Sequence, residues 1–148
     1  MPITFDQFGV CFEYPDNWVV DEPDDPDLNE QVIISSPHTA FWQLSKHPAG
    51  ADLEAIFDEV LAALRTEYKE IEVEPADDYI EGQVIRGFDA NFFYLDLTNT
   101  TWLRGIETPD ANYLLICQAE DREFKEVELV FRAMLASVLR NLSTRGEA

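Results

Sequence analysis

Basic residues are scarce in this sequence: its 148 residues include 10 Lys and Arg against 30 Asp and Glu, which gives a net charge of −20. Binding to nucleic acid depends on cationic side chains that neutralise phosphates, and an anionic lipid surface repels a chain of this charge. We therefore expect neither nucleic acid nor a membrane as a partner. The acid surplus suits a basic protein partner, plain solubility or a high-salt cytosol, and composition does not separate these three.

Long apolar runs are also missing, and so is a basic N-terminal segment. The sequence has no run of about eighteen apolar residues, the length that a membrane span requires. The segment MPITFDQFGVCF lacks the pattern of a signal peptide. We expect a cytoplasmic protein. Cys11 and Cys117 are the only cysteines, and both lie in apolar, strand-like runs. Without a secretion signal we expect reduced, buried thiols. The alternative, a disulfide, requires the two strands to be neighbours.

Two segments have the periodicity of amphipathic helices. Apolar residues recur with the 3.6-residue period over residues 52–69, and Asp52 is placed to cap the start of that helix. The same period holds over residues 122–141, where a wider apolar stripe predicts the more buried helix.

The other segments have the β-branched and aromatic composition of strands. Runs at 8–14 and 18–21 flank Pro-Asp-Asn, which predicts a hairpin connection, and an acidic loop is expected at 21–30. Two further strands, QVIISS and AFWQLSKH, bring the number before the first helix to four, and four or so occupy residues 71–120, with a bend or break near Gly82 or Gly87. Strands joined by short turns pair antiparallel. We expect one α+β domain over residues 1–148, with a single antiparallel sheet of about six to eight strands and two flanking helices on opposite faces.

The stretch YPDNW adds a family resemblance to this fold prediction. Tyr14, Pro15 and Trp18 form a Tyr-Pro-x-x-Trp motif after a leading strand, and together with the order of elements over residues 5–142 the sequence resembles the PsbP-like superfamily. The resemblance implies an antiparallel sheet sandwiched by helices, and a non-catalytic protein that acts as an adaptor or chaperone. No partner-binding residue is transferred by it. We interpret Tyr14 and Trp18 as packing the end of the sheet.

Motifs for metal binding are incomplete. Asp25, Asp27 and Asn29 have the spacing of the first three EF-hand ligands, but Glu30 stands where the turn needs Gly and Ser36 where a bidentate Glu is needed. The histidines and cysteines have no zinc-finger spacing. We expect no metal and no cofactor.

Catalytic motifs are not recognisable either. Cys117 lies among apolar strand residues, which would raise the pKa of its thiol and make it a weaker nucleophile. Asp89 and Asp96 lie in an aromatic strand and are the best acid–base candidates, although an outward-facing strand residue is the simpler interpretation. We expect no enzyme.

Aromatic residues on the predicted strands are the candidate contact residues for a protein partner. These are Trp42, Phe92, Tyr94 and Trp102, and an aromatic side chain that no helix covers would mark a contact surface. Two alternatives remain: a small-ligand-binding or enzymatic α+β domain with an apolar pocket, and a homodimer formed through a sheet edge or the last helix.

Overall fold

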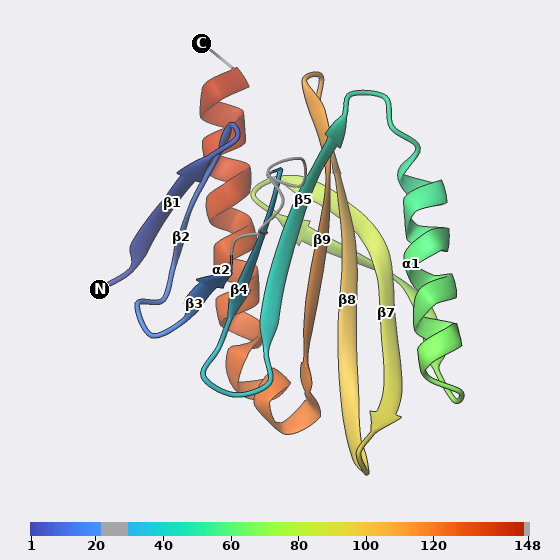
Figure 1. The fold of residues 1–148 in the computed structure, drawn as a ribbon. Coiled ribbons are helices and arrows are strands. Elements are labelled where there is room, and N and C mark those ends of the chain that lie inside the picture. Colours follow the sequence, from blue (N-terminus) through green and yellow to red (C-terminus); the bar gives the residue numbers. More distant parts are fainter. Residues whose placement is uncertain (22–29, 147–148) are drawn as a thin grey trace.

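The computed structural model describes the backbone of residues 1–21 and 30–146 and the side chains of residues 1–21 and 30–142 (Figure 1). The strands are β1 (Ile3–Gln7), β2 (Val10–Tyr14), β3 (Val19–Asp21), β4 (Gln31–Ser35), β5 (Phe41–Pro48), β6 (Glu72–Ile80), β7 (Gln83–Tyr94), β8 (Leu97–Glu107) and β9 (Ala111–Glu120). The helices are α1 (Leu53–Glu67) and α2 (Asp121–Gly146). The predicted α+β class is confirmed.

Seven strands form one sheet in the order β3-β4-β5-β9-β8-β7-β6, and β1 pairs with β2 in a separate two-stranded sheet. Every pair is antiparallel. Short turns join most neighbouring strands, as the sequence predicts. The exception is β5, which pairs with β9 although α1 and β6 to β8 lie between them in the sequence. β9 therefore lies in the middle of the sheet, and both of its faces are covered.

The two helices lie on opposite faces of the sheet, and the alternation along β8 shows how (Figure 1). Leu103 packs with Leu53, Phe57 and Leu61 of α1. Its neighbour Trp102 packs in the larger cluster that contains Phe131 of α2. Successive strand residues point to opposite faces, so these two adjacent side chains belong to different halves of the core.

Each helix forms where the sequence predicts it. The side chain of Asp52 caps α1 by accepting a hydrogen bond from the backbone N–H of Ala55 over 3.2 Å. The helix ends where Tyr68 adopts an extended conformation. On the other face, α2 and the β1–β2 hairpin together cover the sheet. The ring centroids of Phe12 in the hairpin and Trp42 in the sheet lie 4.7 Å apart.

Three details of the strand prediction are wrong. Residues 8–14 are not one strand, because Phe8 and Gly9 take positive φ values and form the β1–β2 turn. The strands on either side of Pro-Asp-Asn do not pair: β2 pairs with β1, and β3 with β4. The long run after residue 78 breaks at Glu81–Gly82, as predicted for Gly82, but a second break at Leu95–Asp96 was not predicted.

Residues 22–29 lie outside the described part of the chain, and with them most of the predicted acidic loop and the partial EF-hand match at Asp25, Asp27 and Asn29. Among the described residues, no helix has the length and apolar character that crossing a membrane requires.

Candidate partner-binding surface

The hairpin between β7 and β8 ends in a two-residue loop that is unusual for its composition. Tyr94 pairs with Leu97, and the loop residues Leu95 and Asp96 have φ values of 52° and 63°. Positive φ at both central positions is the geometry of a type I′ turn, which favours Asn-Gly. A leucine in this conformation is strained, so the turn is held at some cost in stability.

Apolar side chains are exposed around this loop. The exposed fractions are 64% for Phe93, 53% for Tyr94, 78% for Leu95 and 38% for Leu97. We call these four residues the aromatic tip. The hairpin projects at the lower end of the sheet in Figure 1. Single exposed apolar residues are ordinary, whereas four of them at the end of one hairpin favour an interaction site. Phe93 points to the opposite face of the hairpin from Tyr94 and Leu97.

Tyr68 supports the aromatic tip from the end of α1. Its ring stacks on Phe92 with 3.9 Å between centroids and meets Tyr94 edge-on at 5.9 Å. Burial first, and then the nearby carboxylate of Glu67, raise the pKa of the Tyr68 phenol above its usual value. The phenol therefore stays neutral, and the ring acts as a fixed support under Tyr94.

A cavity of about 550 Å³ lies next to the aromatic tip. Its lining residues are Glu70, Ile71, Glu72, Asn91, Phe92, Phe93, Thr98 and Asp121. We call this space the acidic cavity, because three of its lining residues are carboxylates. Those three come from the segment after α1, from β6 and from the first residue of α2, so the fold and not the local sequence brings them together.

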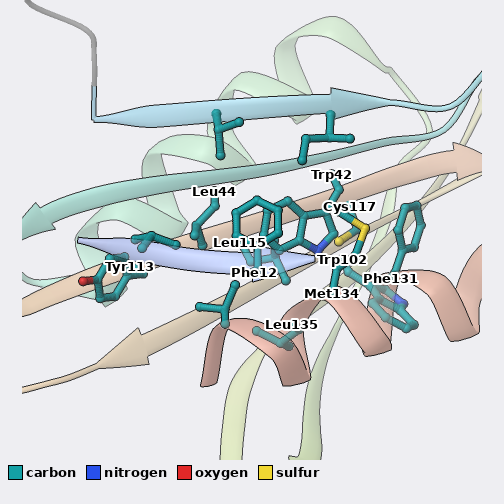
Figure 2. Packing of buried hydrophobic residues seen from close by; sticks show 14 of the residues in the cluster. Phe12, Trp42, Leu44, Trp102, Tyr113, Leu115, Cys117, Phe131, Met134 and Leu135 are labelled. Atoms are coloured by element: carbon teal, nitrogen blue, oxygen red, sulfur yellow. The ribbon is translucent and has the colours of Figure 1, made fainter. Parts of the chain in front are cut away.

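The structure separates the four aromatic residues that the sequence singles out. Trp42 is fully buried and Trp102 is 5% exposed, and Figure 2 shows both in the packed core with Cys117 and Phe131. Phe92 is buried under Tyr68. Tyr94 is exposed on the aromatic tip. Tyr94 is thus the one member of this group on the aromatic tip, and Phe92 lines the adjoining acidic cavity. The contact of these residues with a partner stays a prediction.

The rest of the aromatic tip was missed by the sequence interpretation, which took the residues after Asp89 as one continuous strand. A signal was available in FFYLDL, residues 92–97. A half-buried strand alternates apolar and polar residues, whereas Phe93, Tyr94 and Leu95 are consecutive. Where only one face of the strand is covered, such a run leaves at least one of the three exposed.

The acid–base candidates occupy structural or exposed positions. Asp89 accepts a hydrogen bond from Nη2 of Arg104 over 2.8 Å, and Asp96 lies in the hairpin loop. Burial raises the pKa of the Cys117 thiol well above its usual value, against a smaller opposing effect of the Arg104 charge. Cys11 and Cys117 are both free cysteines.

Metal ligands do not gather in the described part of the chain, where no group of three His, Cys, Asp or Glu side chains is placed to hold an ion. His38 is exposed, and His47 lies 3.1 Å from the Ser45 hydroxyl through its Nε2. The two histidines lie at opposite ends of the β5 region and do not form a site.

A second cavity of about 420 Å³ lies between the turn after β2 and helix α2. Apolar groups from Tyr14, Pro15, Val130 and Met134 line it, with Arg140 at one side. This cavity has the apolar lining that the small-ligand alternative requires, although it lies away from Asp89 and Asp96.

No family model matches the chain, and no curated protein matches it. Solved structures do. Cyanobacterial PsbP (CyanoP) from Synechocystis sp. PCC 6803 has a TM-score of 0.63 at 11% identity, and the match covers 93% of this chain and 89% of that one. The chain has a PsbP-like fold. A protein of unknown function from Pseudomonas aeruginosa has a TM-score of 0.54 at 13% identity over 92% of this chain and 94% of its own.

A protein from Bacteroides thetaiotaomicron is also similar, with a TM-score of 0.60 at 15% identity over 90% of this chain but only 46% of its own length. Identities this low show the fold alone. Within the PsbP-like fold, the Tyr-Pro-x-x-Trp motif has a structural role here. The backbone N–H of Trp18 donates to the Pro15 carbonyl over 3.1 Å, and the buried Trp18 ring meets Phe131 edge-on at 6.0 Å.

Proposed function

We propose that this PsbP-like protein is a non-catalytic protein-binding module, acting as an adaptor or chaperone, and that its aromatic tip contacts the partner. The observation that carries the proposal is the exposure of Phe93, Tyr94 and Leu95 on a hairpin that projects from the sheet. Large aromatic side chains lose few rotamers on binding and dominate the energetics of protein interfaces.

The rigidity of the surface favours the same interpretation. Tyr94 is held against Tyr68, which is itself stacked on the buried Phe92. A side chain that is already ordered loses less entropy when a partner covers it. The strained loop residue Leu95 adds a second argument, because strain retained in an exposed turn indicates that the apolar side chain has a use there.

Site-specific photocrosslinking tests the proposal. The photoreactive residue p-benzoylphenylalanine is placed at Phe93 or Tyr94 of the full chain in cells of the source organism. Tyr79 and Leu129 are control positions, because their side chains are more exposed than those of Phe93 and Tyr94, at 75% and 78%, but lie on β6 and α2, away from the aromatic tip. We expect adducts with one and the same second protein from both tip positions and none from the controls.

Competition makes the outcome specific. Excess unlabelled wild-type protein should suppress the adduct, and so should the Tyr79→Ser/Val84→Ser variant, whereas Phe93→Ser/Tyr94→Ser should not. Adducts that form equally from all four positions, or that the tip variant suppresses as well as wild type does, would contradict the proposal.

The small-ligand alternative rests on the second cavity, whose volume of about 420 Å³ falls within the range of ligand sites. Ala133→Trp would fill this space. If an apolar fluorescent dye bound the wild-type chain and not this variant, and the aromatic tip captured no partner, the alternative would replace the proposal.

A further inference from the structure

The acidic cavity gives the proposed partner a chemical character. Glu70, Glu72 and Asp121 contribute carboxylates to it, and no Lys or Arg is among its described lining residues. Lys69 precedes Glu70 but does not line the space. Arg122 follows Asp121, but its Nε donates to Glu120 Oε1 over 2.9 Å and so is directed elsewhere. The three carboxylate residues therefore line the cavity without a Lys or Arg of the described chain among its lining residues.

The cavity also has an aromatic wall and fixed polar groups. Phe93 belongs both to the aromatic tip and to the lining of the acidic cavity. The Thr100 hydroxyl lies 2.7 Å from Oδ1 of Asp121, which holds that carboxylate in place. An aromatic face beside carboxylates suits a planar cation, which can stack on the ring while it donates to the oxygens.

Charge decides between the classes of occupant. A second copy of this chain would bring another net charge of −20 to a surface that is already acidic, and an anionic lipid surface would be repelled in the same way. A cationic segment meets opposite charge at the cavity and apolar surface at the tip. Electrostatic complementarity of this kind sets partner choice and the rate of encounter.

We propose that the acidic cavity takes the guanidinium of an arginine from the partner, while the aromatic tip contacts apolar residues next to that arginine. This inference rests on the proposed function, since it assigns the partner chemistry of the same surface. Arginine fits better than lysine, because its rigid fork can donate to more than one of the carboxylates that three elements contribute to the cavity, while its flat face lies on Phe93.

Two matched synthetic peptides test the inference by NMR titration of the full chain. The first carries an arginine flanked by leucine and phenylalanine, and the second replaces that arginine with citrulline, which keeps the shape and removes the charge. We expect the arginine peptide to bind at least about tenfold more tightly, with shifts at Glu72, Phe93 and Asp121.

Variants locate the effect. Glu70→Gln/Glu72→Gln should abolish the preference for arginine over citrulline, whereas Glu54→Gln/Asp58→Asn, which removes the same charge from α1, should keep it. A rise in salt concentration should weaken binding of the arginine peptide more than binding of the citrulline peptide.

The outcomes separate the two proposals. Equal binding of the two peptides, or a preference for arginine that survives Glu70→Gln/Glu72→Gln, would overturn the arginine inference and leave the aromatic tip in place if Phe93→Ser/Tyr94→Ser still abolished binding. Binding of both peptides that is unaffected by Phe93→Ser/Tyr94→Ser would overturn the proposed function itself. Absence of any arginine-dependent shift at millimolar peptide would also overturn the inference.

Discussion

Arg104 on β8 donates from Nε to Oδ2 of Asp78 on β6, two strands away, over 2.5 Å. Only 2% of the Arg104 side chain is exposed, and Gly87 is its register partner on the intervening strand β7. A Cβ at position 87 would meet the backbone of Leu103 and Arg104 on β8. The ion pair ties the edge strand β6 to β8, across β7.

This arrangement extends to helix α2. Arg132 forms an ion pair with the other oxygen of Asp78 over 3.0 Å, and the guanidinium groups of Arg104 and Arg132 lie 5.1 Å and 4.9 Å from the ring centroid of Trp102. The tryptophan that the sequence presents as a partner contact is therefore part of a cation–aromatic cluster inside the fold.

We predict that Arg104→Met destabilises the protein by about 3–5 kcal/mol, because it leaves the buried carboxylate of Asp78 short of a partner. Arg86→Met is the matched control on the neighbouring strand, where the side chain is exposed, and it should change stability by no more than about 0.5 kcal/mol. Urea unfolding measures both values. Equal costs for the two variants would contradict the role of the buried ion pair.

Gly87→Ala should destabilise the protein by about 3 kcal/mol. A Cβ at this position would lie 1.7 Å from the backbone oxygen of Leu103, which cannot move without disturbing the strand pairing. Gly105→Ala is the comparison, because its nearest contact, at 2.8 Å, is the ring of Phe57, a side chain that can shift. In thermal unfolding, Gly87→Ala should have a clearly lower melting temperature than Gly105→Ala, and the reverse order would refute this explanation.

Glu123 anchors the start of α2 to the β4–β5 turn. Its carboxylate accepts hydrogen bonds from the Ser36 hydroxyl at 2.7 Å, the Thr39 hydroxyl at 2.5 Å and the Thr39 backbone N–H at 2.7 Å. Burial by itself would raise the pKa of Glu123, but these hydrogen bonds outweigh it and lower the pKa below the usual value. Glu123→Gln should cost about 1–2 kcal/mol at neutral pH.

The direction of the pKa shift of Glu123 determines how the cost of Glu123→Gln depends on pH. Because the pKa of Glu123 is lower in the folded than in the unfolded protein, its contribution is complete above the unfolded value of about 4.3 and is lost as the pH falls through the folded value. The difference in unfolding free energy between wild type and Glu123→Gln should therefore shrink on acidification. A free-energy difference that stays constant with pH would contradict the proposed role of Glu123. So would the same pH dependence for Glu126→Gln, on the exposed face of α2.

Replacing the hairpin loop with the preferred residues should raise stability and lower binding. We expect Leu95→Asn/Asp96→Gly to stabilise the protein by about 1 kcal/mol, since both residues accept the positive φ values of the type I′ turn. The same change removes an apolar side chain of the aromatic tip, so crosslinking from Phe93 should weaken. A loop variant that gains stability and keeps full crosslinking would show that Leu95 has no role in binding.

The sequence predicted the helices and the fold class because both depend on periodicity. The stripes over 52–69 and 122–141 specify helices whatever they pack against, and short turns between strands specify antiparallel neighbours. The pairing of β2 was not predictable in this way. Pro-Asp-Asn marks a turn, but whether the flanking strands pair depends on β1 and β4, which compete for them.

The site was harder to predict than the fold. Trp42, Trp102 and Tyr94 are all aromatic strand residues, and their local sequences do not say which of them a helix or hairpin covers. Burial depends on where α2 and β1–β2 lie, which is a property of the whole chain. Likewise, Glu72 and Asp121 line one cavity although they are far apart in the sequence.

The most direct test of the central claim is the affinity of the protein for the partner that photocrosslinking identifies. We predict that Phe93→Ser/Tyr94→Ser weakens binding about 100-fold or more, whereas Tyr79→Ser/Val84→Ser, which removes a similarly exposed pair from β6 and β7, changes it less than about twofold. Isothermal titration calorimetry with the purified proteins gives both values. Equal affinities for the two double variants would contradict the assignment of partner binding to the aromatic tip.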